Sequence, residues 1–171
     1  MRLFMISGPG GSGTSTMKAA RTEIMNPARY ACIDIDEVGF NWWDYAGTDH
    51  ESKYHDDCIA EAVKRAAGRD LIFVSCTNPQ DFIGKHVLPD GVDSTVFIIL
   101  NPTDEAIWER LRARPAERGF TSDDKIEPHI GYNQWFRRNK GKFPLVIDNT
   151  NQSIDETAGI IRKYIENYPK I

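Results

Sequence analysis

The chain has 171 residues, of which 40% are hydrophobic and 27% charged, so it is long enough to bury a core and short enough for one domain. Its 21 Lys and Arg residues against 25 Asp and Glu residues give a formal charge of -4, which argues against wrapping duplex nucleic acid and favours a small-molecule partner. Three widely spaced cysteines (Cys32, Cys58 and Cys76) predict neither a disulfide framework nor a zinc site. The apolar runs are too short for a signal peptide or a membrane span, so we expect a soluble, cytoplasmic protein without a membrane partner.

Short apolar runs rich in Ile, Val and Phe predict five buried strands. They cover residues 2–7, 30–35, 71–76, 95–100 and 144–148. Helical patterns lie between them, and this alternation is typical of an α/β fold in which helices cover both faces of a parallel sheet. Internal repeats and linkers are absent from the sequence, which indicates a single domain.

Two pairs of residues have the spacing of a capping box, in which a hydroxyl and a carboxylate satisfy the first N–H groups of a helix. Thr48 and Glu51 predict the start of a helix over about 49–67. Ser153 and Glu156 predict the start of the final helix.

A further helix is expected after the fourth strand. Asn101 as N-cap, with Pro102 at the first helical position, predicts its start, and Pro115 predicts its end. Residues 115–143 form the least regular part of the sequence, and we expect a flap there.

A glycine-rich loop follows the first strand directly. Residues 8–16 read GPGGSGTST, and the helical stretch MKAARTEIM comes next. In such a turn successive backbone N–H groups face phosphate oxygens, and the N-terminal dipole of the following helix favours the same anion. We therefore expect the loop to bind the phosphates of a nucleotide through Gly8, Gly10, Gly11, Ser12, Gly13, Thr14, Ser15 and Thr16.

The loop matches the P-loop pattern G-x4-G-K-[ST] except at one position. Gly8 and Gly13 occupy the glycine positions and Ser15 the position whose hydroxyl normally reaches Mg²⁺, but Thr14 replaces the lysine. Lys18 lies one helical turn further, and helical side chains lean toward the N-terminus, so its ammonium either covers the lysine position or faces solvent. Arginines from another segment are the competing source of this charge.

Polar residues follow the second and third predicted strands. Alternation along a strand places Asp34 and Asp36 on one side, near the carboxyl edge where ligands collect in parallel sheets. We expect Asp34 to orient Mg²⁺ and Asp36 to accept the proton of an attacking hydroxyl, while the alternative is that one of them caps the next turn. Thr77 and Asn78 are expected to offer polar groups to the same pocket.

Arginines gather after the fourth strand. Arg110 and Arg114 stand one helical turn apart and Arg118 follows in a loop, so all three are candidates to bind a triphosphate bidentately. A solvated charged face is the alternative. A second basic run contains Arg137 and Arg138, which indicate either a solvated surface or a site for the phosphates of a nucleotide acceptor.

Aromatic side chains crowd the segment GFNWWDYAG at 39–47, whose glycines argue against a regular helix. Trp42, Trp43 and Tyr45 are candidates to stack on an acceptor's base or sugar ring, and packing of an ordinary flap is the alternative. Four histidines lack metal-ligand spacing and are expected to be exposed or to cap turns: His50, His55, His86 and His129.

On these residues the chain resembles the P-loop small-molecule kinases, which include nucleoside monophosphate kinases, shikimate kinase and gluconate kinase. The resemblance extends over most of the chain and depends on the loop at 8–16, on Asp34-Ile35-Asp36 and on ERLRARPAERG at 109–119. It implies a three-layer P-loop kinase fold with a five-stranded parallel sheet in the order 2-3-1-4-5. It also implies an acceptor-binding insertion at about 38–68 and a lid at about 112–128 whose arginines contact the transferring phosphoryl group.

The function implied is that of a kinase that uses ATP and Mg²⁺ to phosphorylate a hydroxyl or phosphate of a nucleoside, nucleotide or related small molecule. A modified base in a polynucleotide is a less favoured acceptor. Two alternatives remain open. The missing lysine is compatible with a non-catalytic nucleotide-binding protein, and the Ser-Gly-Thr loop also resembles the phosphosulfate-binding loop of sulfotransferases, although no basic residue lies within it.

Overall fold

A computed structural model describes residues 1–14, 25–77, 79 and 88–169, in which five parallel strands form one sheet. The strand order is β2-β3-β1-β4-β5, as the resemblance implied. The bounds are β1 (Arg2–Ser7), β2 (Tyr30–Asp34), β3 (Asp70–Val74), β4 (Ser94–Leu100) and β5 (Leu145–Ile147). All five predicted strands are confirmed, with ends that differ from the predictions by at most two residues.

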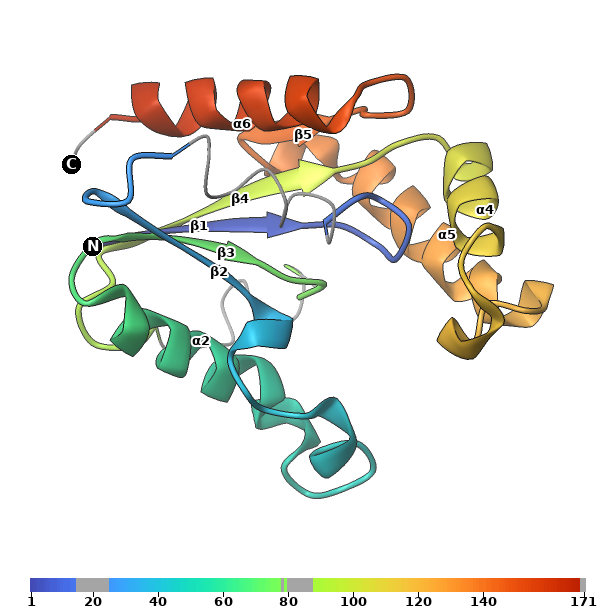
Figure 1. The fold of residues 1–171 in the computed structure, drawn as a ribbon, viewed down its shortest axis with the longest axis horizontal. Helices are drawn as coiled ribbons and strands as arrows, with labels where there is room; N and C mark the ends of the chain where they lie inside the picture. The colour runs from blue at the N-terminus through green and yellow to red at the C-terminus, as the bar shows by residue number, and fades with distance from the viewer. Residues whose placement is uncertain (15–24, 78, 80–87, 170–171) are drawn as a thin grey trace.

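Helices pack on both faces of the sheet, as Figure 1 shows. The main helices of the described residues are α2 (Tyr54–Ala66), α4 (Asp104–Arg112), α5 (Asp123–Arg138) and α6 (Ile154–Asn167). Side chains alternate along β1, so that Leu3 and Met5 join the core beneath α2, while Phe4 and Ile6 join the core beneath α6. This alternation produces the expected three layers. None of the helices in the described ranges is long and apolar enough to cross a membrane.

Helix α2 begins later than predicted because the Thr48–Glu51 capping box does not form. The Thr48 hydroxyl donates to the carbonyl of Tyr45, and the Glu51 carboxylate accepts the N–H of Gly47 at 2.6 Å. A 3-10 helix at Glu51–Lys53 precedes α2 instead. The buried stripe of α2 is as expected and consists of Tyr54, Cys58, Ala62 and Ala66.

The start of α4 also differs from the prediction. Thr103, not Asn101, is the N-cap and accepts the N–H of Ala106, while the Asn101 amide donates to Asn133 on α5 at 2.6 Å. The predicted capping box of α6 is confirmed, since Ser153 and Glu156 exchange hydrogen bonds with each other's backbone.

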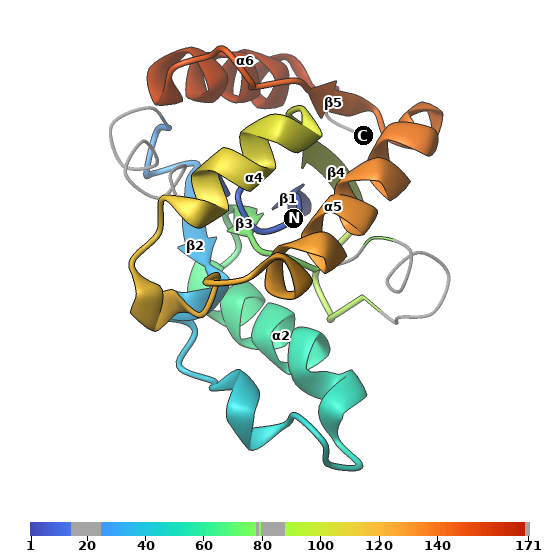
Figure 2. The same ribbon diagram turned by 90° about the vertical axis from the view of Figure 1, so that its right-hand side faces the viewer.

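The prediction that residues 115–143 are the least regular part was wrong, because most of this segment forms α5, a helix of 16 residues. Pro128 and Gly131 weaken its helical pattern, but Ile126, Asn133 and Phe136 are buried along one side. Figure 2 shows α4 and α5 flanking the loop that follows β1. These two helices therefore border the end of the sheet where the glycine-rich loop lies.

Candidate active site

The described part of the glycine-rich loop, residues 8–14, turns tightly at the carboxyl end of β1. The N–H of Ser12 donates to the carbonyl of Pro9 at 3.0 Å. Gly11 and Gly13 have φ angles of 83° and 101°, which glycine adopts without steric cost. Such a turn fits the expected binding of phosphate by backbone N–H groups. Ser15, Thr16 and Lys18 lie outside the described residues, so their expected roles stay predictions.

Atoms of neighbouring elements lie very close to two other glycines of the loop. A Cβ atom at Gly8 would lie 2.7 Å from the carbonyl oxygen of Leu100, at the end of β4. A Cβ atom at Gly10 would lie 2.8 Å from the imidazole ring of His129 on α5. Both distances are shorter than carbon contacts allow. At Gly8 the close atom belongs to the backbone, so the loop requires glycine there in its present conformation, whereas a Cβ at Gly10 would displace the imidazole ring.

Two side chains bind the loop to its surroundings. The Asn149 amide, just after β5, donates to the carbonyl of Ser12 at 2.8 Å. The Arg110 guanidinium on α4 donates to the carbonyls of Gly11, Asn149 and Thr150, with distances of 3.4, 2.9 and 3.2 Å. The loop is therefore tied to both α4 and the β5–α6 connection, which positions it before a ligand arrives.

A cleft of about 340 Å³ opens beside the loop. It is bordered by loop glycines, by two arginines and by the polar start of α6: Gly11, Gly13, Arg110, Arg114, Asn149, Gln152, Ser153, Ile154 and Thr157. The residues at 149–157 were not predicted to border the site. A signal was present, because the polar run DNTNQS follows the last strand, at the sheet edge where the ligands of parallel sheets bind.

The structure brings the three predicted arginines to one region. Arg110 and Arg114 border the same cleft, although α4 ends at Arg112 and Arg114 lies just beyond it. Burial and the charge of Arg118 hold the pKa of Arg114 below its ordinary value. Two guanidinium groups of like charge close together form a cationic site that a phosphate would stabilise.

The contact of His129 with the glycine-rich loop was also not predicted from the sequence. We expected this histidine to be exposed or to cap a turn, but it is half-buried on α5, and its Nδ1 accepts the N–H of Gly10 at 3.2 Å. Its ring also meets Phe120 edge-on with 5.4 Å between centroids. Nothing in its spacing to the other histidines signals this contact. Of the others, His50 is exposed, His55 contacts Thr77 and His86 lies outside the described residues.

Alternation along a strand predicted that Asp34 and Asp36 share one side, and this was wrong because β2 ends at Asp34. The Asp34 carboxylate accepts the N–H of Asp36 at 3.0 Å and caps the 3-10 helix Ile35–Glu37. Asp36 lies within this helix and is exposed. Within residues 1–14, 25–77, 79 and 88–169 no group of three His, Cys, Asp or Glu side chains is arranged to hold a metal, so the Mg²⁺ ligands stay predictions.

The expectation that Thr77 faces the pocket was wrong, because this residue is only 2% exposed. Its hydroxyl contacts Nδ1 of His55 at 2.8 Å and accepts a hydrogen bond from Ser75 at 2.7 Å. Its carbonyl accepts the Ser7 hydroxyl at 2.6 Å, so Thr77 joins β1, β3 and α2. Asn78 lies outside the described residues.

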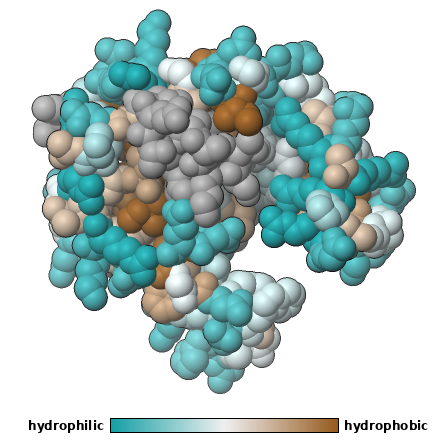
Figure 3. All heavy atoms as spheres, viewed as in Figure 1, coloured by the Kyte–Doolittle hydropathy of each residue, from teal (hydrophilic) through white to brown (hydrophobic). Residues whose placement is uncertain are grey.

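The aromatic segment forms a projecting tip of the molecule. The Trp42 ring packs edge-on against Tyr54, and the Tyr45 hydroxyl donates to Asp57 at 3.0 Å. Trp43 is 78% exposed. Figure 3 shows an open hollow between this tip and the end of the molecule formed by α4 and α5. The 3-10 helix Ile35–Glu37, which carries Asp36, lies between β2 and this tip along the chain.

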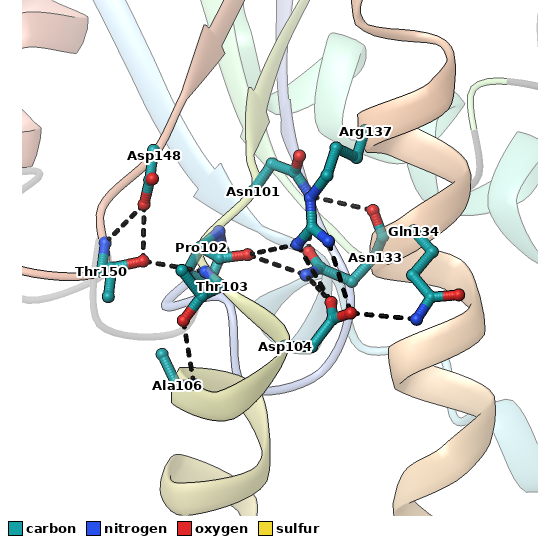
Figure 4. A network of polar contacts seen from close by, with 10 residues as sticks. All are labelled: Asn101, Pro102, Thr103, Asp104, Ala106, Asn133, Gln134, Arg137, Asp148 and Thr150. Carbon is teal, nitrogen blue, oxygen red and sulfur yellow. Dashed lines mark hydrogen bonds and ion pairs between the residues drawn. The ribbon is translucent and has the colours of Figure 1, made fainter.

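The second basic run is not brought to the glycine-rich loop. Arg137 donates to Asp104 at 3.0 Å and to the carbonyl of Pro102 at 3.3 Å, within the network that joins α4 to α5 in Figure 4. Arg138 is exposed at the end of α5. Arg137 therefore stabilises the junction of two helices in this conformation.

A parallel sheet in the order 2-3-1-4-5, with a glycine-rich loop after its central strand, defines the P-loop kinase fold. Solved structures with the same fold include deoxyadenosine kinase from M. mycoides, at 15% identity and a TM-score of 0.59 over 96% of this chain and 98% of that one. Shikimate kinase from Bacteroides thetaiotaomicron matches at 16% identity and a TM-score of 0.57 over the same shares of the two chains. Shikimate kinase from Acinetobacter baumannii, in complex with shikimate, matches at 13% identity and a TM-score of 0.58 over 99% of this chain and 96% of that one. No family model and no curated protein matches the sequence.

Proposed function

We propose that this protein is a kinase that transfers the γ-phosphoryl group of ATP to a hydroxyl or phosphate of a nucleoside, nucleotide or related small molecule. The cleft beside the glycine-rich loop carries the proposal, because it joins the backbone of Gly11 and Gly13 to the guanidinium groups of Arg110 and Arg114. Phosphoryl transfer depends mainly on positioning and on the stabilisation of negative charge. Backbone N–H groups and arginines supply both.

The same cleft has room and chemistry for the donor nucleotide. Its volume of about 340 Å³ falls at the small end of ligand pockets. The side chains of Asn149 and Gln152 offer hydrogen bonds, and Ile154 offers an apolar surface. Among the neighbours in structure, deoxyadenosine kinase from M. mycoides has been solved with dATP bound, which supports a nucleoside triphosphate as donor.

The acceptor belongs in the hollow between the aromatic tip and the α4–α5 end (Figure 3). Asp36 is exposed on the 3-10 helix after β2, and we expect its carboxylate to accept the proton of the attacking hydroxyl. Trp43 is the aromatic residue of the tip most available for stacking, since Trp42 and Tyr45 already pack on Tyr54. Arg138 remains a candidate for acceptor phosphates, whereas Arg137 would first have to leave Asp104.

Mg²⁺ would neutralise phosphate charge when bound, and Ser15 and Asp34 are the residues we expect to hold it. A carboxylate offers the hard oxygen ligands that Mg²⁺ prefers, directly or through water. The arginines then contact the oxygens of the transferring group from the side of α4. The charge of Arg118 acts on Arg114, and this repulsion falls when a phosphate binds between the two guanidinium groups.

The experiment is a transfer assay with γ-labelled ATP against nucleosides, nucleotides, shikimate-like alcohols and single-stranded oligonucleotides, combined with calorimetric titration of ATP. We expect ATP binding and label transfer to one class of acceptor. Transfer to none of them, with ATP bound, would contradict the kinase proposal. It would favour a non-catalytic nucleotide-binding protein, a second candidate that the threonine at position 14 supports.

A further inference from the structure

His129 accepts a hydrogen bond from one of the backbone N–H groups of the glycine-rich loop. Its Nδ1 accepts the N–H of Gly10 at 3.2 Å, and ring atoms lie 2.8 Å from where a Cβ of Gly10 would stand. No other side chain within the described residues makes so close an approach to Gly10. The loop thus meets an imidazole at a position where backbone N–H groups of such loops face anions.

The hydrogen bond fixes the protonation state of the ring. An acceptor nitrogen carries no proton, so the neutral imidazole has its hydrogen on Nε2. Burial and the positive charge of Arg114, at the end of α4, lower the pKa of His129. Residues 8–14 contribute no ionisable side chain, and Phe120 offers only a ring edge. Within the part of the chain that the structure describes, no carboxylate offsets Arg114 among the groups that act on His129.

An incoming phosphate would act against both the hydrogen bond from Gly10 to His129 and the lowered pKa of the ring. A phosphate oxygen carries negative charge and is a stronger acceptor for the Gly10 N–H than a neutral imidazole. Its charge also favours the protonated ring and offsets the repulsion by Arg114. A protonated imidazole no longer accepts from Gly10 and instead donates from both nitrogens. It would add the positive charge that Thr14 does not supply.

We propose that His129 on α5 is a phosphate-binding residue of the site at the glycine-rich loop. Its imidazole releases the N–H of Gly10 to the phosphate chain of the nucleotide and then binds that chain as an imidazolium. The exchange takes up one proton from solvent and forms no covalent bond. The proposal rests on the proposed function, which identifies the ligand as a nucleoside triphosphate.

The test measures proton uptake on binding. ATP and inorganic tripolyphosphate are titrated calorimetrically at pH 7 in buffers of different ionisation enthalpy, without metal, into the parent protein, His129→Gln and His50→Gln. Glutamine can still accept from Gly10 but cannot be protonated, and His50 is an exposed histidine directly before the 3-10 helix Glu51–Lys53. We expect the parent and His50→Gln to take up more protons than His129→Gln, because only His129→Gln lacks the imidazole that becomes protonated. Ionisation of the ligand itself contributes equally in all three proteins.

A second measurement keeps the test valid if His129→Gln does not fold. The imidazole resonances of the parent protein are followed against pH with and without saturating ATP. We expect ATP to raise the pKa of His129 by about one unit or more, which means that the protein with a protonated His129 binds ATP about tenfold or more tightly than the protein with a neutral one. ATP binding with an unchanged pKa, or with equal proton uptake in all three proteins, would overturn the role of His129 alone. Failure of both ATP and tripolyphosphate to bind would overturn the proposed function as well.

Discussion

Thr14 is the position at which this loop departs from its motif, and the structure shows what surrounds the departure. Arg110 and Arg114 border the cleft next to Gly13, and His129 contacts the loop from α5. These side chains are our candidates for the positive charge that a P-loop lysine provides. We infer that a lysine at position 14 is not needed for phosphate binding.

The substitution Thr14→Lys tests this inference. We expect turnover to stay level or to fall, because the new ammonium would meet like charges already placed at the cleft. Arg114→Ala should lower turnover by about 10²-fold, the usual effect of losing one donor to a developing charge. Steady-state kinetics on both variants, with Arg162→Ala on the exposed face of α6 as control, gives the comparison. A large gain in Thr14→Lys without loss in Arg114→Ala would refute this inference.

Asp36 is the carboxylate to which we assign the acceptor proton. Asp36→Asn should leave ATP affinity nearly unchanged and lower transfer by about 10²-fold or more, because the amide cannot take a proton. The matched control is Asp90→Asn, an exposed aspartate in a turn at the opposite end of β4. Single-turnover kinetics separate transfer from binding, and parent-level transfer in Asp36→Asn would show that the assignment is wrong.

Helix α5 carries two features that the sequence did not reveal. Pro128 and Gly131 disfavour a helix locally, yet tertiary burial of Ile126, Asn133 and Phe136 outweighs this preference. The helix brings His129 to Gly10 and Arg137 to Asp104, contacts between residues 119 and 33 positions apart in the chain. Local pattern says nothing about partners at such separations, so these contacts were beyond sequence reasoning.

Asn133 joins α5 to the start of α4 (Figure 4). It is fully buried, donates to Pro102 and Asp104 at 2.8 Å each, and accepts from Asn101 at 2.6 Å. Asn133→Ala leaves these buried partners short of hydrogen bonds and should lower the free energy of unfolding by about 2–3 kcal/mol. Urea denaturation measures the change, with the exposed Asn167→Ala on α6 as control. Equal stability of the two variants would contradict the role of the network.

Asp104 makes this junction sensitive to acid. Burial raises the pKa of its carboxyl, but hydrogen bonds from Gln134, Arg137 and Asn133 outweigh burial and leave the pKa below its usual value. A carboxyl whose pKa is lowered by folding stabilises the fold at pH values above its pKa in the unfolded chain, which is about 3.9. This stabilisation is lost as the pH falls through the pKa in the folded protein. Unfolding free energies at pH 7 and pH 3 should therefore differ less in Asp104→Asn than in Asp90→Asn. A difference as large as that of the control would contradict this reading.

At the scale of the whole molecule, the sequence predicted the sheet well because buried parallel strands are continuous apolar runs, and all five appear where expected. The loop at 8–16 and the arginines near 110–118 were singled out because their residue types suit phosphate binding, and their roles stay predictions. The polar wall at 149–157 was missed because no single residue in it is distinctive. The α4–α5 junction was missed because its partners meet only in three dimensions.

The central claim is that the glycine-rich loop binds ATP, and one calorimetric comparison tests it most directly. Gly13 and Gly91 both have positive φ angles, 101° and 86°, so alanine strains the backbone at either position, but only Gly13 borders the cleft. We predict that Gly13→Ala weakens ATP binding by tenfold or more, roughly 1.4 kcal/mol, while Gly91→Ala binds as the parent does. Equal ATP affinity in Gly13→Ala, Gly91→Ala and the parent would contradict the account.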